Sequence, residues 1–345
     1  MPHSIPFPVQ PEVARALARG LWGLMDVDGG ATAEQQRVFL TLATHLLRVG
    51  VTPPATLQPF TPAELAEELT ESHGRRLFLQ MAIILDLCRH PKSERQLKRL
   101  EHYAEALGVD PPQLAIVRNF AHLSAAEATA RFIRLYDKYI PELSEDHGRE
   151  INGEKQHDDE GFFEAVERLA DMPTGSLGWA FIQFYQRNGI PMPGRDTPNP
   201  GYYVCHDMNH VITGYEPTGP GEIALGGFKL ALNNSDANWM ASLTNLLIHE
   251  VGLFKHGSDQ QFVPYGGGGE PYHGLDGRRG ALDLPGAAEL FAEALVRGAS
   301  CQGDFSRLDH LAMAAEPLRE IRRRFHVLPL QQPMLNDPDH WPEAY

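Results

Sequence analysis

The sequence predicts an all-α protein made of two helical domains. Apolar residues recur at three- and four-residue steps, segments that alternate at two-residue steps are nearly absent, and proline and glycine stand at the breaks. Hydrophobic residues make up 42% of the 345 residues, which is ample for a large buried core. We therefore expect packed helices and no extended sheet.

The first domain is predicted over residues 10–141 as a helical bundle. Pro53, Pro91 and Gly108 stand among the residues that separate its helices, and Ser124 is a suitable N-cap for the last one. Helical periodicity marks six segments, at residues 12–25, 34–49, 75–88, 96–107, 112–122 and 124–141.

A change of composition separates this bundle from a second domain. Residues 142–160 are almost entirely polar, so we expect a charged linker there, followed by a domain at 161–330 and a tail at 331–345. The glycine-rich stretch from Tyr265 to Gly280 has no preceding strand and no Lys-Ser/Thr pair, which favours a mobile loop over a phosphate-binding loop. Helices are expected at 161–171, 175–188, 201–213, 222–232, 237–255, 285–298 and 305–325.

Charge and cysteine content restrict the function classes. The formal net charge is −15, with 45 acidic against 30 basic residues, which disfavours nucleic acid as a partner. Cys88, Cys205 and Cys301 are too few and too widely spaced for a disulfide framework or a zinc ribbon. With no signal-peptide pattern and no long apolar run, a cytoplasmic protein is expected, with peripheral attachment to the inner face of the membrane left open.

The strongest candidate for chemistry is a metal site in the second domain. His206 and His210 are four residues apart, so on a helix both imidazoles share one face. Asp207 is rotated by about 100° and would act from the flank or through another ligand. A turn rich in glycine and proline then lets Glu222 begin the next helix and place its carboxylate beside the two imidazoles. This donor set favours Zn²⁺, with Fe²⁺, Mn²⁺ or Mg²⁺ as alternatives.

The pattern H-D-x-x-H-x₁₁-E formed by these four residues resembles the signature of the coenzyme Q biosynthesis protein 4 family. The flanking segments Met172–Gly178, Ile190–Pro191, Val211–Gly214 and Leu318–Pro329 are also similar to that family, so the resemblance covers about residues 160–330.

The resemblance implies a helical fold that binds a divalent metal and an isoprenoid-tailed quinone precursor. It implies metal ligation by His206, Asp207, His210 and Glu222, and either oxidative decarboxylation at ring carbon C1 of a prenylated hydroxybenzoate-type precursor or a scaffold role among other quinone-biosynthesis proteins. A homo-oligomer and peripheral membrane contact are expected with it. Tyr202-Tyr203 stand where close relatives often have Tyr-Arg, so a guanidinium that would pair with a substrate carboxylate is missing.

The first domain resembles, more weakly, a tellurite-resistance TerB-like helical domain. The resemblance rests on Asp26-Val27-Asp28-Gly29 leading to Glu34, and on the apolar run Met81–Leu87. Asp26, Asp28 and Glu34 are a candidate cation site. An acidic turn that binds no ion is the favoured interpretation, because Gly30 stands where an EF-hand loop needs an oxygen ligand.

Two alternative functions remain open. A phosphohydrolase of the HD type would also use a His-Asp doublet, with His157 and Asp236 completing the ligands. A non-catalytic lipid-binding adaptor is the other alternative, in which apolar stripes such as Trp179, Phe184 and Phe228 would wall a lipid tail, although such stripes usually form core. His249 and His256 share a helical face and are interpreted as packed core histidines.

Overall fold

The computed structural model describes residues 9–50, 56–123, 125–144, 150–151, 154–155, 160–197, 200–252 and 280–332. Within these ranges regular structure is almost entirely helical, which confirms the all-α expectation. One antiparallel pair of two-residue strands, β1 (Glu150–Ile151) and β2 (Glu154–Lys155), lies in the segment expected to be a charged linker. The predicted N-cap Ser124, His157, His256 and residues 265–279 of the glycine-rich stretch lie outside the described residues.

The N-terminal half folds into the expected helices and one more. The additional helix, α3, begins after Thr61, whose side chain accepts from the backbone N–H of Glu64 while Glu64 bonds back to the cap. No helix was expected between residues 50 and 74, but Pro62 stands at the first helical position, where proline is a start signal. The elements are α1 (Pro11–Met25), α2 (Ala33–Thr41) with a π-helical turn (Leu42–Leu46), α3 (Pro62–Glu68), α4 (Ser72–Leu87), α5 (Glu94–Ala106), α6 (Pro112–His122), α7 (Ala125–Tyr136) and α8 (Ile140–Leu143).

The C-terminal half departs from the prediction in two places. Residues 305–317 form turns rather than a helix, because their backbone pairs with the start of α10: Leu177 N–H donates to Glu316 and Gly178 N–H to Ala314. The predicted helix 237–255 ends at Glu250. The elements are α9 (Glu160–Glu167), α10 (Leu177–Asn188), α11 (Pro200–Thr213), α12 (Gly219–Leu232), α13 (Asp236–Asn245) with a π-helical turn (Leu246–Glu250), α14 (Ala287–Ser300) and α15 (Leu318–Arg324).

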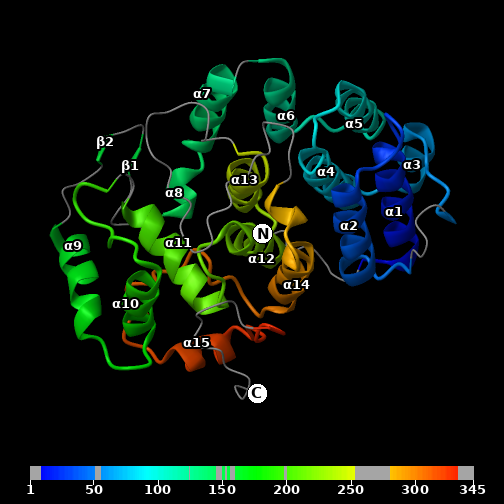
Figure 1. Ribbon diagram of the computed structural model, residues 1–345. Helices are drawn as coiled ribbons and strands as arrows, with labels where there is room; N and C mark the ends of the chain where they lie inside the picture. The colour runs from blue at the N-terminus through cyan, green and yellow to red at the C-terminus, as the bar shows by residue number, and fades with distance from the viewer. Residues whose placement is uncertain are drawn as a thin grey trace.

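Helices α12 and α14 lie at the centre, between α1–α5 on one side and α10, α11 and α15 on the other (Figure 1). Glycines bring the two central helices together, since a Cβ on Gly298 would overlap the carbonyl oxygen of Phe228, and one on Gly227 would overlap the ring of Phe291. The opposite faces of α12 serve different clusters, with Leu230 in one and Phe228 in the other.

One hydrophobic core cluster runs from the N-terminal helices into the C-terminal half. It contains Leu17 and Phe78 from the first half together with Trp239 and Phe291 from the second. A second cluster fills the space between α9, α10, α11, α12 and α15. The division into domains at 142–160 therefore stays a prediction, because apolar packing is continuous across it.

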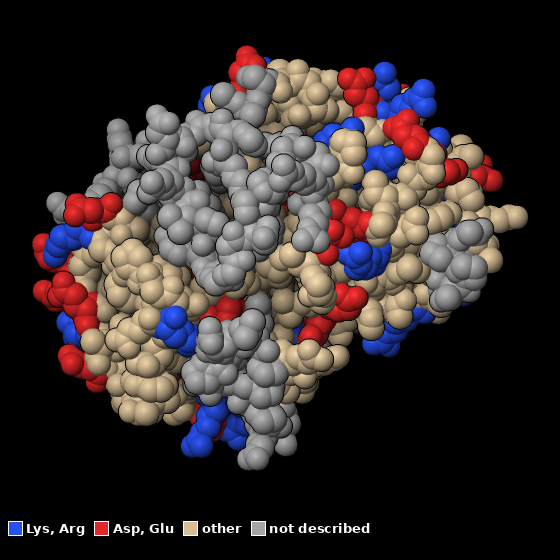
Figure 2. All heavy atoms as spheres, viewed as in Figure 1, with Lys and Arg blue, Asp and Glu red and all other residues tan. Residues whose placement is uncertain are grey.

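Among the described residues, no helix combines the length and apolar character needed to cross a bilayer. On the face seen in Figure 2, acidic and basic side chains are intermingled around the edge, and neutral side chains cover the areas between them. On the part of this face that is coloured, neither sign of charge gathers in one large patch.

Candidate metal centre

The turn between α11 and α12 brings the predicted ligands together. His206 and His210 lie one turn apart on α11, which ends at Thr213, and Gly214 follows with a positive φ of 82°. Thr218 then caps α12 by accepting from the N–H of Gly221 at 3.2 Å. Glu222 therefore stands in the first turn of α12 and faces the two histidines, as the glycine- and proline-rich turn predicted.

Three side chains converge within hydrogen-bond distance. Nε2 of His206 lies 3.0 Å from Oε2 of Glu222, and Nε2 of His210 lies 3.2 Å from Oε1. The two Nε2 atoms are 3.2 Å apart. A hydrogen bond of 2.9 Å between Nδ1 of His210 and the carbonyl of Tyr215 assigns the proton to Nδ1 and leaves Nε2 as the ligand atom.

These spacings fit a bound divalent ion. Donor atoms about 2.1 Å from a metal are separated by about 3.4 Å in a tetrahedral shell and by about 3.0 Å in an octahedral one. The three observed separations, 3.0, 3.2 and 3.2 Å, fall in that range. The residues present therefore suit an ion with at least one further position for water or another ligand, and the geometry does not select one metal.

The side chains of this site are largely buried, and their mutual charges shift the pKa values of Glu222 and His210. His210 is fully buried and His206 is 8% exposed. Burial alone would raise the pKa of Glu222, but the two imidazoles hold it well below its usual range. Burial opposes the protonation of His210, yet the Glu222 carboxylate raises its pKa above the ordinary value. The cluster thus carries a carboxylate ready to balance positive charge in a site largely closed to water.

Asp207 lies beside the cluster and is held by another residue. Its Oδ2 accepts a hydrogen bond from the hydroxyl of Tyr185 on α10. Burial raises the pKa of Asp207, and His206 and His210 act against that rise. No Asp207 oxygen belongs to the group of converging ligand atoms in the described residues, which comprises His206, His210 and Glu222. Direct ligation by Asp207 stays a prediction.

Aromatic rings hold the imidazoles in place. Tyr202 stacks on His206 with centroids 5.4 Å apart, and Phe184 stacks on His210 at 5.5 Å. The sequence placed Phe184 on an apolar stripe and Tyr202 directly before Tyr203, the departure from the family pattern, but it did not indicate these contacts. Phe184 and Phe228 are fully buried in the core, and Trp179 packs against its edge.

The other predicted ligands do not join this centre. Asp28 accepts from Ser93 and pairs with Arg95 at 3.2 Å, while Glu34 lies near His90 and Glu250 instead. Asp236, proposed for the phosphohydrolase alternative, pairs with Arg76 at 2.9 Å, and its side chain is 62% exposed. His249 is buried in the π-helical turn after α13.

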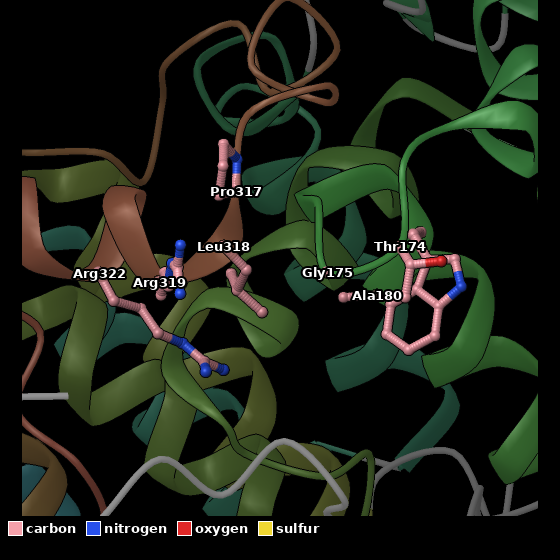
Figure 3. A pocket seen from close by; sticks show the side chains of 8 residues that line it. Thr174, Gly175, Ala180, Pro317, Leu318, Arg319 and Arg322 are labelled. Atoms are coloured by element: carbon pink, nitrogen blue, oxygen red, sulfur yellow. The ribbon is translucent and has the colours of Figure 1, made fainter. Parts of the chain in front are cut away.

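A cavity of about 430 Å³ opens between α10 and α15. Figure 3 shows Thr174, Gly175 and Ala180 on one wall, with Leu318 and Arg322 on the other. The guanidinium of Arg322 donates to the carbonyls of Val211 and Ile212 at the end of α11. This arginine therefore anchors the helix that carries both histidines.

Comparisons with known proteins support the sequence resemblance over part of the chain. No family model matches. An alignment 123 positions long, which covers 32% of this chain, is 31% identical to the mitochondrial ubiquinone biosynthesis protein COQ4 of Paracoccidioides brasiliensis and spans 42% of that relative. The chain is thus distantly homologous, over part of its length, to a COQ4 protein.

Among solved structures, a candidate ubiquinone biosynthesis protein from Nostoc punctiforme aligns with 74% of this chain and 98% of its own, at 14% identity and a TM-score of 0.31. A TM-score this low does not establish a common fold.

Proposed function

We propose that this chain, distantly homologous in part to COQ4, is a divalent-metal-binding protein of ubiquinone biosynthesis. One observation carries the proposal: two imidazole nitrogens and a carboxylate, predicted from the four-residue pattern, meet within 3.0–3.2 Å in a buried site. Zn²⁺ is the ion favoured by this donor set, followed by Fe²⁺, Mn²⁺ and Mg²⁺.

The proposed substrate is an isoprenoid-tailed hydroxybenzoate-type precursor of the quinone ring. A bound ion would act as a Lewis acid that binds the carboxylate of this substrate or activates dioxygen. In the proposed reaction the C1 carboxylate leaves as CO₂ and a hydroxyl, whose oxygen comes from water, takes its place. This is a two-electron oxidation of the ring, and dioxygen accepts the two electrons and two protons to become hydrogen peroxide. His206, His210 and Glu222 would hold the ion, and the Asp207–Tyr185 pair would hold a proton beside it.

The residue three positions before His206 favours a second candidate, lipid presentation without turnover. Tyr203 stands where relatives often carry an arginine, and it is 39% exposed on α11. Without that guanidinium, a substrate carboxylate would depend on the ion alone. Mass spectrometry of lipid copurifying with the native protein, followed by a turnover assay on that lipid, separates the two: bound prenyl lipid with no CO₂ release favours presentation.

Membrane contact and self-association accompany the proposal. An isoprenoid tail partitions into a bilayer, so a protein that takes up such a precursor is expected to meet the membrane surface. Flotation with anionic and neutral vesicles tests that contact, and light scattering tests the expected homo-oligomer.

Metal analysis tests the site directly. Glu222→Gln keeps the side-chain shape but removes the charge, so we expect the chain to lose one equivalent of metal relative to the wild type. Glu105→Gln, on an exposed position of α5, is the control and should retain the full metal content. Equal metal content in the two variants, with both folded by circular dichroism, would falsify the proposal.

A further inference from the structure

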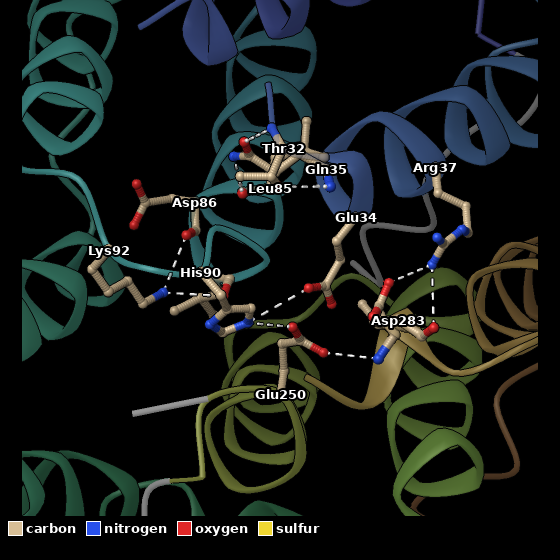
Figure 4. Close-up of polar contacts among 12 residues, drawn as sticks. Thr32, Glu34, Gln35, Arg37, Leu85, Asp86, His90, Lys92, Glu250 and Asp283 are labelled. Carbon is tan, nitrogen blue, oxygen red and sulfur yellow. Dashed lines mark hydrogen bonds and ion pairs between the residues drawn. The ribbon is translucent and has the colours of Figure 1, made fainter. Parts of the chain in front are cut away.

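A second group of metal-type ligands lies where the N-terminal helices meet the C-terminal half. Glu34 comes from the first turn of α2, His90 follows α4, and Glu250 ends the π-helical turn after α13. Figure 4 shows the three side chains pointing toward one another from these separate segments. Each offers a ligand atom, and the three atoms lie within 4.8 Å of one another.

The geometry of this junction leaves donor atoms in place for an ion. Nε2 of His90 lies 2.8 Å from Oε1 of Glu250 and 3.9 Å from Oε2 of Glu34. The other Glu250 oxygen accepts from the backbone N–H of Leu282 at 2.8 Å, which fixes the orientation of the carboxylate. A Cβ at Gly280 would overlap that carboxylate, so a larger residue at this position would displace the Glu250 side chain.

Burial at the junction is nearly complete. The side chains of His90, Glu34 and Glu250 are 2%, 7% and 0% exposed. Oε1 of Glu34 is buried and has no hydrogen-bond partner among the described residues. The neighbouring carboxyl group of Glu250 interacts with Glu34. Two buried carboxyl groups in contact need either a shared proton or a cation between them, and a divalent ion would meet that need.

The nearby cations are engaged elsewhere. Nζ of Lys92 donates to the carbonyls of Asp86 and Leu87, and Arg37 pairs with Asp283 at 2.6 Å. Burial and the neighbouring carboxylate of Glu250 raise the pKa of Glu34 to about 9. Without an ion, Glu34 therefore holds a proton at neutral pH. A divalent ion bound by Glu34, His90 and Glu250 would displace that proton and balance the charges of both carboxylates.

We propose that Glu34, His90 and Glu250 form a second divalent-cation site, distinct from the α11–α12 centre, that fastens the N-terminal helices to the C-terminal half. One imidazole and two carboxylates suit Zn²⁺, Mn²⁺ or Fe²⁺, whereas Mg²⁺ and Ca²⁺ prefer oxygen alone. Because its ligands are buried and come from three segments, the site is structural rather than catalytic. The inference does not depend on the proposed function.

Metal stoichiometry tests the second site on the full-length protein. The chain is stripped with a chelator, returned to neutral pH and titrated with Zn²⁺ alone. We expect two equivalents for the wild type, one for Glu250→Gln, one for Glu222→Gln and none for the double variant. Asp86→Asn, which removes another buried carboxyl from the N-terminal helices, is the matched control and should bind two.

Each site can fail separately. If the wild type binds one equivalent that Glu222→Gln loses and Glu250→Gln keeps, the junction is a hydrogen-bonded cluster and the second site is refuted. If the single equivalent instead disappears in Glu250→Gln and survives in Glu222→Gln, the junction site stands and the proposed function fails.

If Glu250→Gln does not fold, Co²⁺ absorption spectroscopy tests the second site without that variant. Co²⁺ added to Glu222→Gln should give a d–d absorption band from the remaining site. Adding Glu34→Gln to that variant should weaken Co²⁺ binding more than the loss of a residue that only orients a ligand, which costs about 10- to 100-fold. Absence of any Co²⁺ band in folded Glu222→Gln overturns the inference.

Discussion

At the scale of single residues, helical rotation assigns different tasks to adjacent side chains. His206 and His210 share a face and meet Glu222, whereas Asp207, rotated by about 100°, turns toward Tyr185 on the neighbouring helix α10. The backbone carbonyl of Tyr215 orients His210 through Nδ1. The convergence of His206, His210 and Glu222 was therefore predictable from spacing, but Tyr185, which holds Asp207, comes from a helix that the motif spacing does not relate to it.

Tyr185→Phe tests the support given to Asp207. The substitution leaves the buried ring in place and removes the hydroxyl donor, so we expect the free energy of unfolding to fall by about 1–3 kcal/mol. Zn²⁺ affinity should fall by about 10- to 100-fold, as for other contacts that orient ligands. Tyr203→Phe, partly exposed on α11, is the control. Equal unfolding and titration curves for the two variants would contradict a special role for Tyr185.

The pH dependence of the metal-free protein follows from the Glu222–His210 pair. Glu222 has a pKa far below its ordinary 4.5, so its stabilising contribution is present above pH 4.5 and is lost as the pH falls through the lowered value. His210 has a pKa raised above 6.5, so its contribution is present below pH 6.5 and is lost as the pH rises through the raised value.

The metal-free wild type should therefore exceed Glu222→Gln in stability most clearly between pH 4.5 and 6.5. Urea unfolding of both proteins in a chelator, over a series of pH values, measures this difference. A difference that does not change with pH would show that the pair is not ionised as inferred.

At the scale of elements, glycine decides how closely α12 and α14 pack. In an isolated helix, alanine is favoured over glycine by about 1 kcal/mol. At Gly298 that gain is outweighed, because the added methyl group would meet the backbone of Phe228 on α12. The sequence alone therefore does not indicate whether a glycine within a helix weakens that helix or permits a close contact with another one.

Gly298→Ala should lower the free energy of unfolding by about 1–3 kcal/mol, the cost of overpacking a core. Gly74→Ala on α4 is the matched control, since its nearest neighbours would lie 3.5 and 3.7 Å from the new methyl group. That variant should be neutral or more stable by up to about 1 kcal/mol. Chemical denaturation compares the two, and a stabilised Gly298→Ala would exclude the close contact.

At the scale of the whole molecule, the continuous core predicts one cooperative unfolding unit. Leu17 and Phe78 share a cluster with Trp239 and Phe291, and Gln80 exchanges hydrogen bonds with Asn234 across the same junction. Differential scanning calorimetry of the metal-loaded chain should give a single transition with equal calorimetric and van't Hoff enthalpies. Two separate transitions would support independent domains divided at 142–160.

The sequence by itself determined the helical class, most helix positions and the convergence of His206, His210 and Glu222. These properties depend on local periodicity and on a short turn, so residues near in the chain suffice to specify them. It also indicated the relationship to COQ4 proteins, because the motif lies within one contiguous stretch of the chain.

Only the tertiary structure decided which distant residues meet. Glu34, His90 and Glu250 are brought together by packing between three segments, and residues 305–317 are held in turns by backbone bonds to α10. Such contacts join positions up to hundreds of residues apart, and no local propensity encodes them. A side chain's partners across the core depend on the packing of the whole chain, which is why the junction was absent from the sequence prediction.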